Sequence, residues 1–268
     1  MLVAALALSA VLACEPPLRS LRVCADPNNL PFTNASGEGF ENRIAEILAD
    51  ELDAELEYTW WPQRRGFVRH TLRAGSCDLL LGVPSDFELA WTTKPYYRSG
   101  YVFVTRVDGP EITSLDDPSL RDLRVGVQLV GDDYANTPPA HALADRGMAS
   151  QLVGYSVYGD YSQPNPPARI VEAVARGDVD VAVVWGPLAG YFGAQESPRL
   201  RLTPVRPAID RGVLPFEFDI SLAVRRGDTA LHAAVESAMD RRRADVDRVL
   251  AHYGVPRLDT VPQLEGGS

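Results

Sequence analysis

Two adjacent arginines follow two adjacent tryptophans in the segment EYTWWPQRRGFVRHTLRAGSCDLLLGV, which spans residues 57–83. A guanidinium group can bind a carboxylate through two parallel hydrogen bonds, and a tryptophan ring offers a large flat surface to a ligand or a protein. The candidate binding residues in this segment are Trp61, Gln63, Arg64 and Arg65. The alternative is structural, with the tryptophans packed in the core and the arginines solvated or capping backbone carbonyl groups.

Sequence signatures of catalysis and of metal binding are absent. The stretch GYSVYG at 154–159 falls short of the GxSxG pattern around a nucleophilic serine, and no glycine-rich loop suited to phosphate is present. The histidines lack the short spacing of zinc ligands; they are His70, His141, His232 and His252. We therefore expect a protein that is not an enzyme and that uses neither a cofactor nor a metal ion.

The N-terminus and the charge indicate an exported protein. Residues 1–13 are uncharged and mostly apolar, which predicts a signal peptide, although the usual positive start is missing. The run is too short to cross a bilayer core of roughly 30 Å, so we expect no transmembrane segment. The sequence VLAC at 11–14 partly matches a lipid-attachment box, so a lipid anchor at Cys14 stays open. A net charge of −10 argues against a nucleic-acid partner, which would require a basic face.

The first part of the chain alternates strand-like and helix-like patterns. Apolar strand patterns occupy 21–26, 56–61 and 77–83, and apolar residues recur at helical spacing in 37–52 and 66–75. This strand–helix order predicts a parallel sheet with helices on its faces, because crossover connections are right-handed.

A second series of the same kind follows. Strand patterns lie at 122–128, 151–159, 179–186 and 200–205, with helices expected at 140–145, 166–176 and 186–193. Long apolar stretches at 101–107 and 216–228 connect the two series, and a helical tail is expected at 229–253. The sequence therefore predicts two α/β lobes joined by a two-strand hinge. The first lobe comprises residues 14–106 and 217–268, and the second comprises residues 107–216.

The loops that follow the strands of the first lobe are expected to form the mouth of a cleft. In open α/β sheets the ligand crevice lies at the carboxyl ends of the strands. The loop 62–66 follows the second strand and brings the two arginines to that edge. The same mouth is expected to receive three residues that follow the first strand and three that precede the stretch 101–107: Asn28, Asn29, Phe32, Tyr96, Tyr97 and Arg98.

Several long motifs resemble one family. The order of elements is similar to that of type II periplasmic solute-binding proteins across nearly the whole mature chain. Within that class, LRVCADPNNLPFTN, GEGFENRIAEIL, YTWWPQRRGFVRHTL, GSCDLLLGVPS and TTKPYYRSGYVFV resemble the J-type accessory proteins of methanol dehydrogenase operons (MxaJ and XoxJ). These proteins are also described as quinoprotein dehydrogenase-associated substrate-binding proteins. The resemblance implies a two-lobed type II periplasmic binding protein fold, each lobe a mostly parallel sheet flanked by helices.

The resemblance also implies a function. We expect a periplasmic protein, soluble or lipid-anchored, that binds a methanol dehydrogenase dependent on pyrroloquinoline quinone (PQQ) and assists its maturation or activation. A receptor for a small organic ligand in the interlobe cleft, coupled to a transporter, is the alternative.

The charged groups by which related receptors hold amino acids are missing. Such receptors resemble one another in an arginine shortly before an SxPYY motif, which grips the α-carboxylate, and in an acidic residue that receives the α-ammonium. Here the first interval contains no arginine and offers Asp86 and Glu88, while Trp185 and Gly186 replace the acid. An amino acid would leave its charges desolvated in such a cleft, so we expect no standard amino acid to bind.

Two cysteines are candidates for a disulfide bond. Cys24 falls in the first strand and Cys77 just before the third, and in this fold class those strands are parallel neighbours. Their Cα atoms could then lie within the roughly 4.4–6.8 Å that a disulfide requires, and the periplasm is oxidising. The alternative is a pair of buried free thiols.

Overall fold

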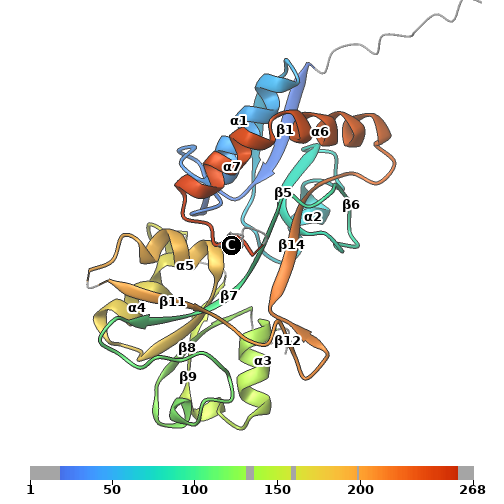
Figure 1. The fold of residues 1–268 in the computed structure, drawn as a ribbon. Helices are drawn as coiled ribbons and strands as arrows, with labels where there is room; N and C mark the ends of the chain where they lie inside the picture. The colour runs from blue at the N-terminus through green and yellow to red at the C-terminus, as the bar shows by residue number, and fades with distance from the viewer. Residues whose placement is uncertain (1–18, 131–135, 158–160, 198, 259–268) are drawn as a thin grey trace, which may run out of the picture.

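A computed structural model describes residues 19–130, 136–157, 161–197 and 199–258. The predicted signal peptide and Cys14 lie outside the described residues. The described chain forms two α/β lobes, with two long strands running between them (Figure 1). No helix in the described ranges is both long enough and apolar enough to cross a membrane.

The first lobe is built around three parallel strands. β1 (Ser20–Ala25) pairs with β4 (Glu55–Trp60) on one side and β5 (Leu79–Pro84) on the other. The lobe also contains the short strands β2 (Asn28–Asn29), β3 (Thr33–Asn34) and β6 (Trp91–Thr92). Its helices are α1 (Phe40–Glu51), α2 (Phe67–His70), α6 (Thr229–Arg241) and α7 (Arg243–His252).

The second lobe repeats the plan. β8 (Val125–Leu129) pairs in parallel with β9 (Leu152–Ser156) and β10 (Val181–Trp185). β11 (Leu200–Pro204) lies at the sheet edge, and β12 (Ile209–Asp210) and β13 (Leu214–Pro215) form a small hairpin. The helices are α3 (Pro138–Asp145), α4 (Arg169–Arg176) and α5 (Gly186–Gly193), with short 3-10 turns at Pro118–Asp122, Ala149–Gln151 and Pro166–Ala168.

Two antiparallel strands connect the lobes. β7 (Tyr97–Arg106) pairs with β14 (Glu217–Val224) through its first four residues and with β10 and β11 through the rest. The strand order of the sheet is therefore β4-β1-β5-β14-β7-β10-β8-β9. This architecture confirms the predicted two-lobed α/β fold. The division of the lobes at residues 106/107 and 216/217 stays a prediction.

Two predicted helices differ in extent from the structure. The helix expected at 66–75 is limited to α2, because the backbone leaves the helical conformation at Thr71 (φ −116°, ψ −89°). The Thr71 hydroxyl donates to the Phe67 carbonyl (2.7 Å) at this end of the helix. The following turns bring Cys77 back to β1. The tail expected as one helix breaks at Arg242, whose guanidinium binds Asp245 (2.5 Å) and Asp50 (2.8 Å).

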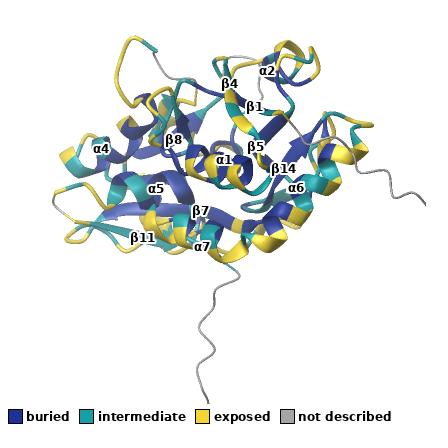
Figure 2. Cartoon of the chain, turned by 90° about the horizontal axis from the view of Figure 1, so that it is seen from above, coloured by how far each residue is buried: buried dark blue, intermediate teal, exposed yellow. Residues whose placement is uncertain are grey.

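Apolar side chains fill the space between the sheet and its helices. Figure 2 shows the central strands largely buried and the helices exposed on their outer faces. In α1 the buried side chains include Ile44, Ala45 and Leu48, which pack on β1 and β5 through Leu21 and Leu79. The helical period of 3.6 residues therefore decides which face of this helix meets the sheet.

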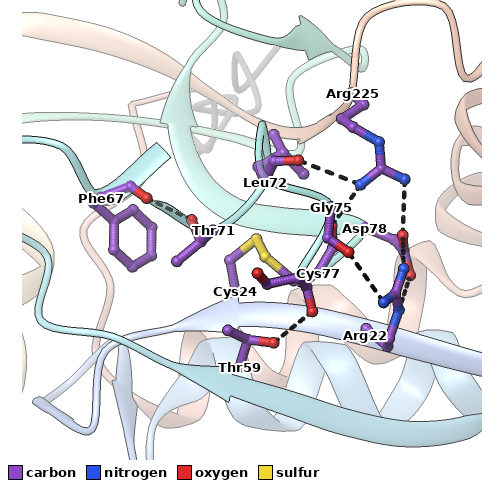
Figure 3. The surroundings of a disulfide bond; sticks show 11 residues. Arg22, Cys24, Thr59, Phe67, Thr71, Leu72, Gly75, Cys77, Asp78 and Arg225 are labelled. Carbon is purple, nitrogen blue, oxygen red and sulfur yellow. Dashed lines mark hydrogen bonds and ion pairs between the residues drawn. A yellow bond between two sulfur atoms is a disulfide. The ribbon is translucent and has the colours of Figure 1, made fainter. Parts of the chain in front are cut away.

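The predicted disulfide between Cys24 and Cys77 is present, with a Cα–Cα distance of 5.4 Å (Figure 3). Beside it, Asp78 receives hydrogen bonds from Arg22 (2.7 Å) and Arg225 (2.9 Å). Burial opposes ionisation of this carboxyl, but the two guanidinium groups outweigh burial and hold the pKa of Asp78 below its usual value. The disulfide and the charged cluster thus both link β1 to the segment that leads into β5.

Candidate functional site

A cavity of about 650 Å³ lies between the lobes. Its floor is formed by β5, β7 and β14, and its rim by the loops that follow β1 and β4. The second lobe contributes side chains that include Gln128, Thr137, Tyr161 and Leu188. The volume falls within the range of roughly 300–1,000 Å³ seen for small-molecule sites.

Most of the predicted cleft residues line this cavity. They come from the loop after β1, the loop after β4, the start of β7 and the end of β10. They are Asn28, Asn29, Phe32, Gln63, Arg64, Arg65, Tyr97 and Trp185. Whether they bind a ligand or a partner stays a prediction.

Two residues of the PYYR motif do not line the cavity, contrary to expectation. Side chains alternate between the two faces of a strand, so Tyr97 faces the cavity while its neighbours face away. Tyr96 is buried against the Tyr97 ring, with ring centroids 4.9 Å apart. Arg98 lies on the outside, where it pairs with Glu217 (3.4 Å) and Asp219 (3.5 Å).

Trp61 and Asp86 also lie outside the cavity lining. Trp61 is 42% exposed and stacks on His70, with ring centroids 5.4 Å apart. It points outward because successive residues of an extended segment point to opposite sides. Asp86 is exposed in the turn after β5. Both positions are accessible to a partner protein, but neither contributes to the interlobe cavity.

Asp26, at the carboxyl end of β1, organises the rim. The residue is 3% exposed, and its carboxylate accepts hydrogen bonds from the backbone N–H groups of Asn28 (2.8 Å) and Gln63 (2.6 Å). The Asn29 side chain donates to the Gln63 side chain (3.0 Å). One buried carboxylate therefore joins the loop after β1 to the loop after β4.

The same carboxylate connects the two lobes. The Tyr161 hydroxyl donates to Asp26 (2.5 Å), and the Asn28 side chain donates to the Gln163 carbonyl (2.8 Å). The Arg64 guanidinium lies 5.0 Å from the Tyr161 ring centroid, a cation–π distance. Burial and the bond to Asp26 raise the pKa of Tyr161, so the hydroxyl keeps its proton. These contacts close the cleft on the side of the arginine pair.

A second carboxyl group, Glu41 in the first turn of α1, lies deeper in the cavity. The residue is 7% exposed, and burial raises the pKa of its carboxyl group to about 8. It packs against Gly82 of β5, where a Cβ atom would overlap the Glu41 carboxyl oxygen. Gly82 has a positive φ of 69°, so this close approach requires glycine at that position.

Sequence reasoning missed Asp26, Glu41 and Tyr161. Asp26 ends a strand at the cleft edge, so its position carried a usable signal. Glu41 lies three, four and seven residues before Ile44, Ala45 and Leu48, which places it on the buried face of its helix. Tyr161 carried no such signal, because it lies 135 residues from Asp26 in an irregular segment.

The lining determines what kinds of ligand the cavity can hold. Among the described lining residues the carboxylates are Asp26 and Glu41, both in the first lobe. Trp185, at the end of β10, packs its ring edge-on against Tyr101 (5.4 Å) and Phe218 (5.9 Å). The described residues contain no cluster of three or more potential metal ligands.

Comparison with known proteins places the chain in a family. It is 34% identical over 259 residues to protein MoxJ of Methylorubrum extorquens strain AM1, an alignment that covers 92% of this chain and 84% of that protein. The chain belongs to the MoxJ family. No model in a scan of protein families matches it.

Solved structures agree with the MoxJ relationship. MxaJ from Methlophaga aminisulfidivorans MPT superposes with a TM-score of 0.78 at 28% identity, covering 89% of this chain and all of the other. The periplasmic binding protein XoxJ from Methylobacterium extorquens AM1 superposes with a TM-score of 0.71 at 34% identity, covering 89% of this chain and 99% of the other. The resemblance inferred from the sequence motifs is therefore confirmed.

Proposed function

We propose that this MoxJ-family chain is a periplasmic accessory protein that binds a PQQ-dependent methanol or alcohol dehydrogenase and assists its maturation or activation, without catalysis of its own. Membership of the MoxJ family over nearly the whole chain carries the proposal. The relative XoxJ is described as a periplasmic binding protein, which supports the location.

The rim around Arg64 and Arg65 is the proposed contact surface. Both arginines are exposed, and the neighbouring Trp61 presents part of its ring to solvent. Tryptophan and arginine are the residue types enriched at interface hot spots. The net charge of −10 repels an acidic partner at long range, but salt screens that repulsion beyond roughly 8 Å, so local contacts at the arginines can dominate.

Charge reversal tests this surface. The double variant Arg64→Glu/Arg65→Glu is expected to weaken binding to the matured dehydrogenase at least about tenfold, which is about 1.4 kcal/mol. Lys94→Glu/Arg248→Glu is the matched control, because it changes net charge equally at two side chains that are each 72% exposed outside the cavity lining. Equal affinities of the two variants, measured by calorimetry, would place the interface elsewhere. Absence of any association at low and physiological salt would reject the accessory role.

The cavity favours a second candidate, a receptor for a small organic solute. A cavity of about 650 Å³ between two lobes is the arrangement that solute receptors use. We expect no binding of glutamate, glutamine, histidine or arginine in calorimetry, because the groups that hold an α-amino acid are replaced. A dissociation constant near 1 μM for any of them, about 8 kcal/mol, would make the receptor the leading function.

A further inference from the structure

The deep end of the cavity contains a carboxyl group without a protein partner. Among the described residues none gives the Glu41 carboxyl a hydrogen bond or an ion pair, and burial is the cause of its raised pKa. Its titratable neighbours are Tyr58 on β4, Tyr97 on β7 and Tyr96 just before β7, and all three have pKa values raised by burial. No neighbouring charge therefore stabilises the ionised form of Glu41, and at neutral pH most of this group keeps its proton.

A buried acid without a partner lowers the stability of the fold. Desolvation of a carboxylate disfavours its charged form, and a core position would normally hold an apolar residue. Gly82 adds to the observation, because it leaves room for the carboxyl group beside β5 at the wall of the cavity. The Glu41 carboxyl group thus lies at the cavity wall, where a ligand can bind it, and no described residue holds it in a structural ion pair.

Aromatic rings line the same end of the cavity. Tyr97 and Tyr101 lie on one face of β7 because they are four residues apart, and Trp185 lies directly opposite Tyr101 on β10. Phe218 of β14 is opposite Ser99, between the two tyrosines. All four rings are in the cavity lining. The faces of such rings attract cations, and several rings together form the cages that hold organic ammonium ions.

We propose that this cavity binds an organic ammonium ion without a carboxylate, with the ammonium group at Glu41 and the apolar part against the rings of Tyr97, Tyr101, Trp185 and Phe218. A cation supplies the charge that the Glu41 carboxylate lacks. An anion would oppose the ionisation of Glu41, and a purely apolar ligand would leave its carboxyl group without a hydrogen bond.

The arginines at the rim do not oppose this assignment. Arg64, Arg65, Arg69 and Arg73 are exposed, so water and salt screen their charges. Two charges at the same separation interact several times more strongly in a desolvated site than in water, because the effective dielectric constant is lower there. The desolvated contact at Glu41 therefore outweighs the screened repulsion at the rim.

Three matched probes test the ligand class: 2-phenylethylammonium, the neutral 2-phenylethanol and the amino acid phenylalanine. The ammonium ion is expected to bind at least about tenfold more tightly than either of the others at pH 8. Its affinity is expected to rise about fiftyfold from pH 6 to pH 8, because Glu41 must lose its proton, and one proton is released for each ion bound at pH 6. Calorimetry in buffers of different ionisation enthalpy measures both quantities.

The variant Glu41→Gln is expected to weaken ammonium binding at least about tenfold at pH 8 and to abolish the pH dependence. The control Glu46→Gln changes an exposed acid on the same helix, which pairs with Arg43, and should bind as the parent does. If Glu41→Gln does not fold, proton release by the parent protein still decides the question. Tighter binding of 2-phenylethanol, no binding of any probe, or a bound cation without proton release would each overturn the proposal.

This inference rests on the cavity and not on the dehydrogenase. Glu41 is buried, whereas the proposed partner contacts are exposed at the rim. The affinity of the Glu41→Gln variant for the dehydrogenase is measured alongside, so that the test of ammonium binding and the test of the accessory role stay separate. A variant that loses ammonium binding but still binds the dehydrogenase supports both proposals. Loss of both in this variant would indicate a changed fold, which circular dichroism detects, and the proton-release measurement on the parent protein then decides.

Discussion

The two lobes share an architecture but are held together differently. The first lobe has the Cys24–Cys77 disulfide and, beside it, the Arg22–Asp78–Arg225 cluster. The described part of the second lobe contains no cysteine. There the Arg146 guanidinium, 6% exposed, binds Asp210 through two hydrogen bonds of 2.7 and 2.8 Å. One lobe thus relies on a covalent bond and the other on a buried ion pair.

The difference matches what each lobe contributes to the cavity. Asp26 and Glu41, the carboxylates of the described lining, both come from the first lobe, and both are buried. Burial makes the ionised form of such acids unfavourable unless hydrogen bonds or opposite charges compensate it. The second lobe supplies neutral polar groups such as Gln128 and Tyr161, which tolerate small movements. The cross-linked lobe therefore carries both acids of the described cavity lining.

The largest expected effect comes from removing the disulfide. The bond closes a loop with a sequence separation of 53 residues, so the chain-entropy account predicts that Cys24→Ser/Cys77→Ser lowers the free energy of unfolding by about 4 kcal/mol. Urea denaturation measures the loss. Hydrogen exchange should show the increased opening in β1 and β5 rather than in β8 and β10. Equal loosening of both lobes, or free thiols in the protein from an oxidising compartment, would contradict the comparison.

The second lobe should respond in the same way to loss of its ion pair. Arg146→Met leaves Asp210 buried without its partner, so we expect a loss of about 3 kcal/mol. The hydrogen bond from Arg146 lowers the pKa of Asp210. The pair therefore stabilises the fold above the usual aspartate pKa, and its contribution disappears as pH falls through the lowered value. The difference between variant and parent should narrow in acid.

An exposed pair in the same lobe is the control for this variant. Arg176 binds Glu172 and Asp178 on the surface of α4, and its side chain is 56% exposed. Arg176→Met is expected to change the unfolding free energy by less than about 1 kcal/mol. A comparable loss in both variants would mean that burial of the Arg146 pair is unimportant.

The sequence predicts the framework well because that information is local. Continuous apolar strands and helical spacing are properties of neighbouring residues, and they located β1, β5, β8 and β10. Strand alternation also decides which residues of PYYR meet the cavity, and applying it would have excluded Tyr96 and Arg98. The length of α2 was not predictable in this way, because it depends on the non-helical backbone conformation that Thr71 adopts in the turns leading to Cys77.

The contacts between lobes could not be predicted from the sequence. Tyr161 meets Asp26, and Gln163 meets Asn28, across 135 residues in each case. Such pairs depend on how the two lobes close on each other, which no local pattern specifies. The candidate residues were found by their place at strand ends, whereas their partners in the second lobe were not found.

The smallest expected effect concerns the contact that joins the two lobes. Tyr161→Phe removes the bond to Asp26 and keeps the ring beneath Arg64. Asp26 retains two backbone donors, so we expect at most about 1 kcal/mol of lost stability. The cleft should nevertheless open more often, because a bond between rigid bodies governs their closure more than their folding. Small-angle scattering should show a larger radius of gyration for Tyr161→Phe than for the control Tyr155→Phe, which removes a hydroxyl within the second lobe. Identical scattering from both variants would mean that the arginine–tyrosine and asparagine contacts suffice to close the cleft.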